Sequence, residues 1–212
     1  MNKRINRLTG GLVATGAASA AILAMTATGA QAATTYTPTG GSANFVGSSV
    51  SFTDIEAGQT LTCSTFNLSG SVTSSGTSRA YGADAGSLGT LTSSGCTNPI
   101  AGATTVTPSG TWTVAITGDK TGTVWPARLK NVVANVSAVN CTFTASGVVN
   151  GKFDTATQKF TPNSGASGLT INSGAGAPSG SMCVTLDLQP GDNVAVGGSW
   201  TNTGTAVAIT NP

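Results

Sequence analysis

Few side chains of this protein could do chemistry. The 212 residues include four cysteines, seven aspartates or glutamates and nine lysines or arginines, but no histidine. Without histidine, a Ser-His-Asp or Cys-His nucleophile lacks its general base, and a Cys/His zinc site lacks its nitrogen ligands. A Ser-x-x-Lys nucleophile is also absent, because no lysine follows a serine by three positions. The sequence therefore predicts a protein that is not an enzyme and that holds no cofactor or metal ion.

The carboxylates offer one pair to weigh. Asp54 and Glu56 lie two positions apart, so a strand would present both on one face, and glycosidases work with two carboxylates. The run Glu-Ala-Gly-Gln-Thr that follows Ile55 favours the alternative, a solvated strand end. Asp187 and Asp192 flank Leu-Gln-Pro-Gly, which indicates a turn.

The cysteines indicate disulfides. Cys63, Cys96, Cys141 and Cys183 are an even set, and the closest two are 96 − 63 = 33 positions apart. That spacing excludes the C-x-x-C pattern of zinc sites and redox dithiols, and an even set in an exported chain is typical of a disulfide framework. Three pairings are possible.

An internal repeat favours one of these pairings. Residues 60–118 and 138–204 each hold, in order, a cysteine, a Ser-Gly with a nearby valine, a second cysteine and a Gly-x-Trp segment. The repeat predicts Cys63 with Cys96 and Cys141 with Cys183, and it leaves open whether the chain is one unit or two similar half-units. Each closed loop would stabilise the fold by roughly 4 kcal/mol.

Alternation of apolar and small polar residues predicts the fold class. The pattern is clear in Ser42–Ile55 and in Thr111–Gly118, and β-branched residues argue against a helix over Leu129–Val149. Short clusters of Gly, Ser, Asn and Pro separate these runs. We therefore expect an all-β protein whose antiparallel strands form a β-sandwich, either Ig-like or jelly-roll-like.

The aromatic residues suggest where a ligand could bind. Trp112 and Trp200 occupy equivalent places in the repeat and alternate with threonine, which is typical of a sandwich core. Trp125 precedes Pro126 after a turn, and Tyr81 lies in a loop-like Ser-Arg-Ala-Tyr-Gly-Ala segment. Because exposed rings can stack on sugars or apolar chains, we name Trp125 and Tyr81 as ligand-binding candidates.

The first 32 residues predict export. A basic start, an apolar stretch and Ala30-Gln31-Ala32 have the form of a secretory signal peptide, which leaves one secreted domain over residues 33–212 with no membrane span. Three of the nine basic residues lie in this leader, so the remainder has a formal net charge of 6 − 7 = −1. Its basic residues do not cluster, and we expect no nucleic-acid partner.

The chain also resembles a known group of proteins. The Ser-Gly-x-Val, Gly-x-Trp and Gly-Val-Val-Asn-Gly segments and the block Met182–Trp200 resemble secreted Ser/Thr/Gly-rich proteins of high-GC Gram-positive bacteria. More distantly they resemble the exported activators of alkane oxidation (PraB-like proteins). The resemblance covers roughly residues 42–203 and implies an accessory role outside the cell or at its surface.

Two functions follow from these observations. The first is a non-enzymatic secreted or cell-envelope protein with a structural or adhesive role, or one that interacts with hydrophobic material. The alternative is a carbohydrate-binding module that binds polysaccharide. The uncharged segments Ser42–Thr53 and Trp200–Thr210 add an expectation about partners, because unprotected edge strands pair with other strands. If they lie at sheet edges, the protein should associate with itself or with another envelope protein.

Overall fold

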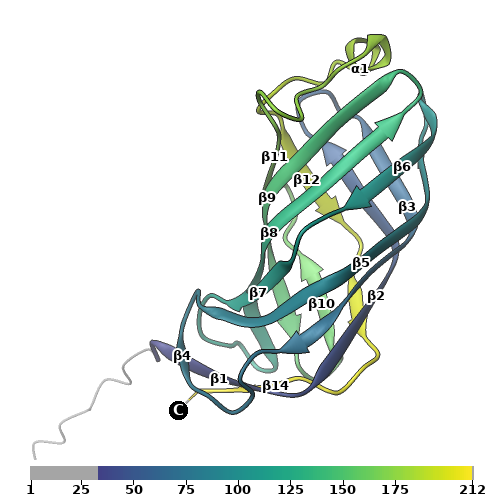
Figure 1. Ribbon diagram of the computed structural model, residues 1–212. Coiled ribbons are helices and arrows are strands. Elements are labelled where there is room, and N and C mark those ends of the chain that lie inside the picture. The colour runs from purple at the N-terminus through teal and green to yellow at the C-terminus, as the bar shows by residue number, and fades with distance from the viewer. Residues whose placement is uncertain (1–32, 212) are drawn as a thin grey trace, which may run out of the picture. The chain divides into compact units, whose positions relative to one another are not determined.

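Long antiparallel strands dominate the computed structural model, which describes residues 33–211 (Figure 1). Strand makes up 63% of the structure and helix 3%. The expected leader, residues 1–32, lies outside the described residues. The elements are β1 (Thr35–Thr39), β2 (Ser42–Asp54), β3 (Thr60–Val72), β4 (Arg79–Ala80), β5 (Asp84–Asn98), β6 (Gly102–Pro108), β7 (Trp112–Ile116), β8 (Val124–Ala138), β9 (Cys141–Asp154), β10 (Lys159–Pro162), β11 (Ala166–Ile171), α1 (Ser181–Thr185), β12 (Asn193–Gly197), β13 (Trp200–Asn202) and β14 (Ala208–Thr210).

The strands close into an eight-strand antiparallel barrel. The long strands β2, β3, β5, β8 and β9 take part along the whole barrel, and shorter strands fill the gaps between them. Between β5 and β8 lies β6 towards one end and β7 towards the other. Between β9 and β2 lie β11 and β12 towards the first end, and β10 and β13 towards the second.

The expectation of a β-sandwich is therefore wrong. The all-β class and the antiparallel pairing are confirmed, but one closed sheet replaces two facing sheets. Closure depends on β12 and β13 pairing with β2, for example Val194 opposite Asp54 and Trp200 opposite Gly47. A barrel and a sandwich both bury every second residue of a strand, so alternation does not distinguish them.

The core fills the barrel along its length. In β3, Leu61 and Cys63 are buried towards one end and Phe66 and Leu68 towards the other, so the row of buried residues shifts by one position between Cys63 and Phe66. The row in β8 shifts in the same way between Leu129 and Val132. At mid-height Phe66 packs against Trp112 and Trp200, with ring centroids 5.9 and 6.2 Å apart. The two tryptophans are each 2% exposed, which confirms their expected place in the core.

A close approach of two strands explains one glycine in this layer. Gly47 lies opposite Trp200, and a Cβ added to Gly47 would come within 2.6 Å of Trp200 Nε1. The indole N–H donates a 2.7 Å hydrogen bond to the Phe66 carbonyl oxygen. The absence of a side chain at Gly47 therefore allows the Trp200 indole to pack closely against β2.

The segment Ser42–Thr53 does not form the free edge that strand addition requires, whereas β14, at the end of the second segment, is an edge strand of a small sheet. β2 pairs with β3 on one side and with β12 and β13 on the other, while β13 lies between β2 and β10. The end of the second segment, β14, belongs to a separate three-stranded sheet with the order β14-β1-β4. Ser42–Thr53 is therefore paired on both sides and cannot add a further strand, since a closed barrel has no edges.

Both predicted disulfides are present. Cys63 is bonded to Cys96, its cross-strand neighbour on β5, and Cys141 at the start of β9 is bonded to Cys183 in α1. These pairings are the ones that the repeat predicts, although one joins two strands and the other joins a strand to a helix. The division into two half-units itself stays a prediction.

Among the residues that the structure describes, no helix is long and apolar enough to cross a membrane.

Candidate contact surface at the α1 end

Four connections and one helix lie at the same end of the barrel, which we call the α1 end. They are residues 55–59 after β2, 99–101 after β5, 139–140 after β8, and 172–192, which include α1. Strand register places them together: Thr62 pairs with Thr97, and Thr105 pairs with Ser137. Figure 1 shows α1 at this end, above the β8–β9 hairpin and opposite the sheet formed by β1, β4 and β14.

Exposed aliphatic side chains gather at the α1 end. Ile55, Ile100, Val139 and Val184 are 44%, 53%, 61% and 79% exposed, and each lies on a different connection. The fifth large hydrophobic residue with high exposure among the described residues is Val46, at 39% on the wall strand β2. In the described part of the chain, exposure of large aliphatic side chains is therefore concentrated at one end of the barrel.

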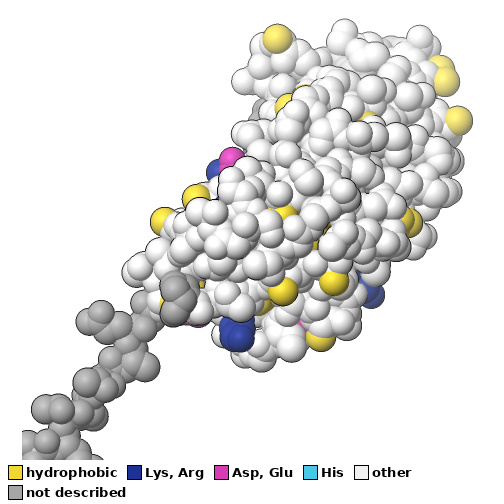
Figure 2. Space-filling model, turned by 60° about the horizontal axis from the view of Figure 1, so that its bottom comes forward, with side chains coloured by type: hydrophobic (Ala, Val, Ile, Leu, Met, Phe, Trp, Pro, Cys, Tyr) yellow, Lys and Arg dark blue, Asp and Glu magenta, His cyan; other side chains and the backbone are white. Residues whose placement is uncertain are grey.

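Charge is distributed unevenly along the barrel as well. The α1 end carries four acidic residues, Asp54, Glu56, Asp187 and Asp192, and within its segments there is no lysine or arginine. The six basic residues that follow position 32 all lie in the other half. Figure 2 brings that opposite end forward and shows scattered Lys and Arg side chains on a surface that is otherwise mostly uncharged.

Helix α1 is held to the barrel by a short, specific set of contacts. Besides the disulfide from Cys183, Thr142 and Ser179 exchange two backbone hydrogen bonds of 2.9 Å, and the Met182 N–H donates to the Asn140 carbonyl. Gly180 has φ 109°, and a Cβ there would lie 2.1 Å from the Asn140 carbonyl oxygen. Only glycine allows the chain to approach the β8–β9 turn this closely.

An internal cavity of about 60 Å³ lies beneath α1. Leu186 and Leu188, which follow the helix, close it from above, and Phe52, Leu61 and Leu169 line its walls. Asp54 is the one ionisable side chain of its lining, and this residue is only 5% exposed. Its Oδ1 accepts a 2.9 Å hydrogen bond from the Ala57 N–H, whereas its Oδ2 is buried without a donor.

The environment of Asp54 favours the protonated form of its carboxyl group. Burial raises the pKa of Asp54, and the carboxyl groups of Asp192 and Glu56 raise it further, while the Ala57 N–H acts in the opposite direction. A proton on Asp54 would remove the cost of burying a charged carboxylate whose Oδ2 has no donor.

Glu56 has a different partner. Its Oε2 and Oε1 accept hydrogen bonds of 2.8 Å from the backbone N–H and the side-chain Nδ2 of Asn193, and these bonds lower its pKa. The Ile55 N–H donates in turn to the Asn193 carbonyl. Glu56 therefore ties the β2–β3 turn to β12. Asp54 is buried instead of solvated, which corrects the expectation of a solvated strand end at this residue.

Replacing Asp54 by asparagine should stabilise the protein at neutral pH. A carboxyl group whose pKa is raised by folding contributes stability that is fully present below its ordinary pKa of 3.8 and is lost as pH rises through the raised value. An asparagine cannot ionise, so it avoids the cost of a buried charge at this position. We expect a gain of about 1 kcal/mol, or roughly 2–4 °C in Tm, at pH 7 and none at acidic pH.

Thermal unfolding of the Asp54→Asn variant and the wild type across the pH range checks this prediction. Asp187→Asn serves as the control, because Asp187 is exposed at the same end. A lower Tm for Asp54→Asn at neutral pH would show that the ionised carboxylate stabilises the fold.

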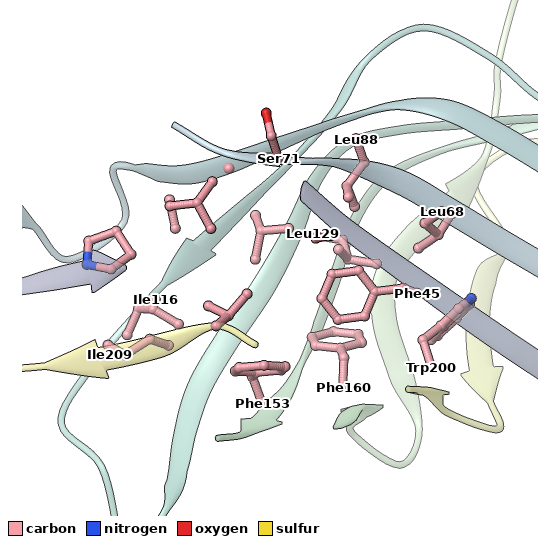
Figure 3. Close-up of a pocket in the computed structure, with 17 residues that line it drawn as sticks. Phe45, Leu68, Ser71, Leu88, Ile116, Leu129, Phe153, Phe160, Trp200 and Ile209 are labelled. Atoms are coloured by element: carbon pink, nitrogen blue, oxygen red, sulfur yellow. The ribbon is translucent and has the colours of Figure 1, made fainter. Parts of the chain in front are cut away.

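A second cavity, of about 50 Å³, lies in the other half of the barrel (Figure 3). Phe45, Phe153, Phe160 and Trp200 face it together with leucines and isoleucines, and Ile209 of β14 approaches from below. Ser71 is the one hydroxyl-bearing residue of the lining. The aromatic layer formed by Phe66, Trp112 and Trp200 lies at mid-height, so the lumen is a packed core and not an open channel.

The two ligand-binding candidates lie in the half away from α1. Trp125 is 0% exposed, because residues 125, 127 and 129 of β8 all point inward; the expectation of an exposed loop ring is wrong for this residue. Tyr81 is half-buried, stacks on Tyr36 with a centroid distance of 5.9 Å, and donates its hydroxyl to Asp119. Burial and this hydrogen bond raise the pKa of Tyr81 to about 12. The structure does not bring Trp125 and Tyr81 into one open site.

The turn at the end of the α1 loop is as expected. The Gln189 N–H donates to Asp192 Oδ2 at 2.7 Å, and the Asp192 N–H donates back to the Gln189 carbonyl at 3.3 Å. Across residues 33–211, no three Asp, Glu, Cys or His side chains come together as a metal ion would require.

Known proteins offer no match to this chain. No family model, no curated protein sequence and no solved structure is similar to it. The resemblance to secreted Gram-positive proteins therefore stays a prediction.

Proposed function

We propose that this protein is exported, is not an enzyme, and acts by contacting hydrophobic material or another protein through the α1 end. The observation that carries the proposal is that, within residues 33–211, four of the five exposed large aliphatic side chains lie at this end. Apolar side chains exposed together, with polar groups around them, are typical of interaction sites. Acidic residues at the same end would keep it hydrated until a partner is met.

The cysteines support the location outside the cell. All four are paired in disulfides, and such bonds persist in oxidising compartments. The leader pattern of residues 1–32 supports export independently of the fold. The role that we propose is therefore that of an accessory protein of the cell envelope or the medium.

Polysaccharide binding has no specific support. Modules that bind sugars by stacking need an exposed flat ring, and within residues 33–211 every Trp, Tyr and Phe is buried or half-buried. The α1 end offers aliphatic groups in place of rings. We therefore retain hydrophobic contact as the proposed function.

Lysine substitutions at the α1 end test the proposal. Ile100→Lys combined with Val184→Lys should reduce binding to hydrocarbon droplets by about 3 kcal/mol, roughly a hundredfold, because two apolar contacts are lost and two charges must be desolvated. Val46→Lys, which places the same charge on an exposed valine of the barrel wall, should bind like the wild type.

Droplet binding is measured by depletion of the protein from solution, with insoluble polysaccharide as a parallel probe. Circular dichroism confirms that each variant is folded. If the Val46→Lys variant lost binding as strongly as the double variant, or if the wild type bound polysaccharide but not droplets, the α1 end would not be the contact surface.

A further inference from the structure

We infer that the α1 end of one molecule binds the opposite, basic end of a second copy, so that barrels associate head to tail. The inference rests on the proposed function and names the partner of the same surface. The basic end comprises the turns 117–123 and 155–158 with the adjacent strand ends, and its exposed cations are Lys120, Lys152 and Lys159.

The two halves of the barrel carry opposite formal charges. The α1 half holds four of the seven acidic residues and no base, a formal charge of −4. The other half holds Asp84, Asp119 and Asp154, and its bases give it a formal charge of 6 − 3 = +3. Those six bases are Arg79, Lys120, Arg128, Lys130, Lys152 and Lys159.

The two ends act as separate patches. β8 has 15 residues, which at about 3.3 Å each give a strand of about 50 Å. Even with strand tilt, this length is several times the Debye length of roughly 8 Å at physiological salt. Attraction between the ends of one molecule is therefore screened, while opposite ends of two molecules can meet directly.

The cations of the basic end are available to a partner. Within the described residues, the one salt bridge joins Lys130 to Asp84, at 2.7 Å on the barrel wall. Lys152 and Lys159 are exposed on the paired strands β9 and β10, close to the turn that joins them. Lys120 lies with its Nζ 5.7 Å from the centroid of the Trp125 ring, which fixes its position beside this turn.

Charge also decides the mode of pairing. Two α1 ends would bring together halves that each have a formal charge of −4, whereas a head-to-tail contact brings a half of −4 against a half of +3. The basic end itself holds Lys120, Lys152 and Lys159 with Asp119 and Asp154, a formal charge of 3 − 2 = +1. The contact is then heterologous, and each molecule keeps one free end of either kind. Such contacts continue as a linear chain unless the geometry closes a ring.

Two variants that each block one end test the inference. The first is the α1-end variant Ile100→Lys/Val184→Lys, whose α1 half has a charge of −4 + 2 = −2. The second is the basic-end variant Lys152→Glu/Lys159→Glu. In this variant the half of the barrel away from α1 has a formal charge of +3 − 4 = −1. The altered ends are both negative and do not attract each other. Thr90→Glu/Thr92→Glu on the exposed face of β5 is the control for added negative charge.

Sedimentation velocity over a wide concentration range gives the readout. We expect the wild type and the β5 control to grow in mass with concentration, and salt to weaken this association by roughly tenfold or more. Each blocked variant alone should remain a monomer. An equimolar mixture of the two should stop at a 1:1 dimer, because only one intact α1 end and one intact basic end can meet.

Two results would overturn the inference. A basic-end variant that still dimerises alone would show that α1 ends pair with each other, and a wild type that stays monomeric at all concentrations would show that no second copy binds. Droplet binding by the α1 end is measured independently in both cases. Failure of the head-to-tail contact is thus distinguishable from failure of the proposed function.

Discussion

Replacing Cys63 and Cys96 together by alanine is expected to lower the free energy of unfolding by roughly 4 kcal/mol, because the bond closes a loop with a sequence separation of 33 residues. The two residues are already cross-strand partners in the β3–β5 pair. The native barrel therefore should keep its shape, and the loss should arise mainly from the greater freedom of the unfolded chain.

The second disulfide supplies the comparison. Cys141 and Cys183 close a loop with a separation of 42 residues, but Cys183 lies in a five-residue helix that few other contacts hold. Cys141→Ala/Cys183→Ala should therefore also release α1 locally, with faster amide exchange over residues 179–192. Urea denaturation measures the global loss for both double variants. Equal stability of the Cys63→Ala/Cys96→Ala variant and the wild type would contradict the chain-entropy account.

Truncation of Trp200 is the second change with a large expected effect. Trp200→Ala should cost about 3–5 kcal/mol, because the indole is 2% exposed and packs on Phe66 and Phe160. It also leaves the buried Phe66 carbonyl without the indole N–H as donor. Trp200→Phe keeps most of the packing and should cost less, about 1–3 kcal/mol, mainly for that lost hydrogen bond.

Chemical denaturation of these variants checks the prediction. Val46→Ala is the control, because it truncates an exposed wall residue on the strand that pairs with Trp200, and it should change stability by less than about 0.5 kcal/mol. If Trp200→Ala were as mild as Val46→Ala, the aromatic layer at mid-barrel would not be the centre of the core.

Much of the local structure could be predicted from the sequence. Alternation predicted the strands β2 and β7, β-branched residues argued against a helix over Leu129–Val149, where β8 and β9 lie, and the repeat predicted both disulfides. The closed barrel could not be predicted in this way, because closure is set by pairs such as Asp54 with Val194, which are far apart in the chain. The same strands, paired differently, would have made a sandwich with an identical pattern of buried residues.

The candidate site was hidden for a related reason. Ile55, Ile100, Val139 and Val184 are single aliphatic residues in four separate turn-rich segments, and only strand register brings these segments to one end. A signal was present for Ile55, Ile100 and Val139, since each interrupts a segment that is otherwise small or polar, but Val184 stands among Met182, Leu186 and Leu188. For Trp125 the sequence suggested exposure where the structure shows burial. Its neighbouring turn and Pro126 suggested a loop, although Trp125 begins the inward-facing row of β8.

We propose that the α1 end is the surface through which this protein acts. Amide hydrogen exchange of the dilute protein, with and without hydrocarbon droplets, tests it most directly. We predict that droplets slow exchange over residues 55–59, 99–101 and 181–192, and leave the turns 117–123 and 155–158 unchanged. Protection confined to those latter turns or to the barrel wall, or no protection at all, would contradict the claim.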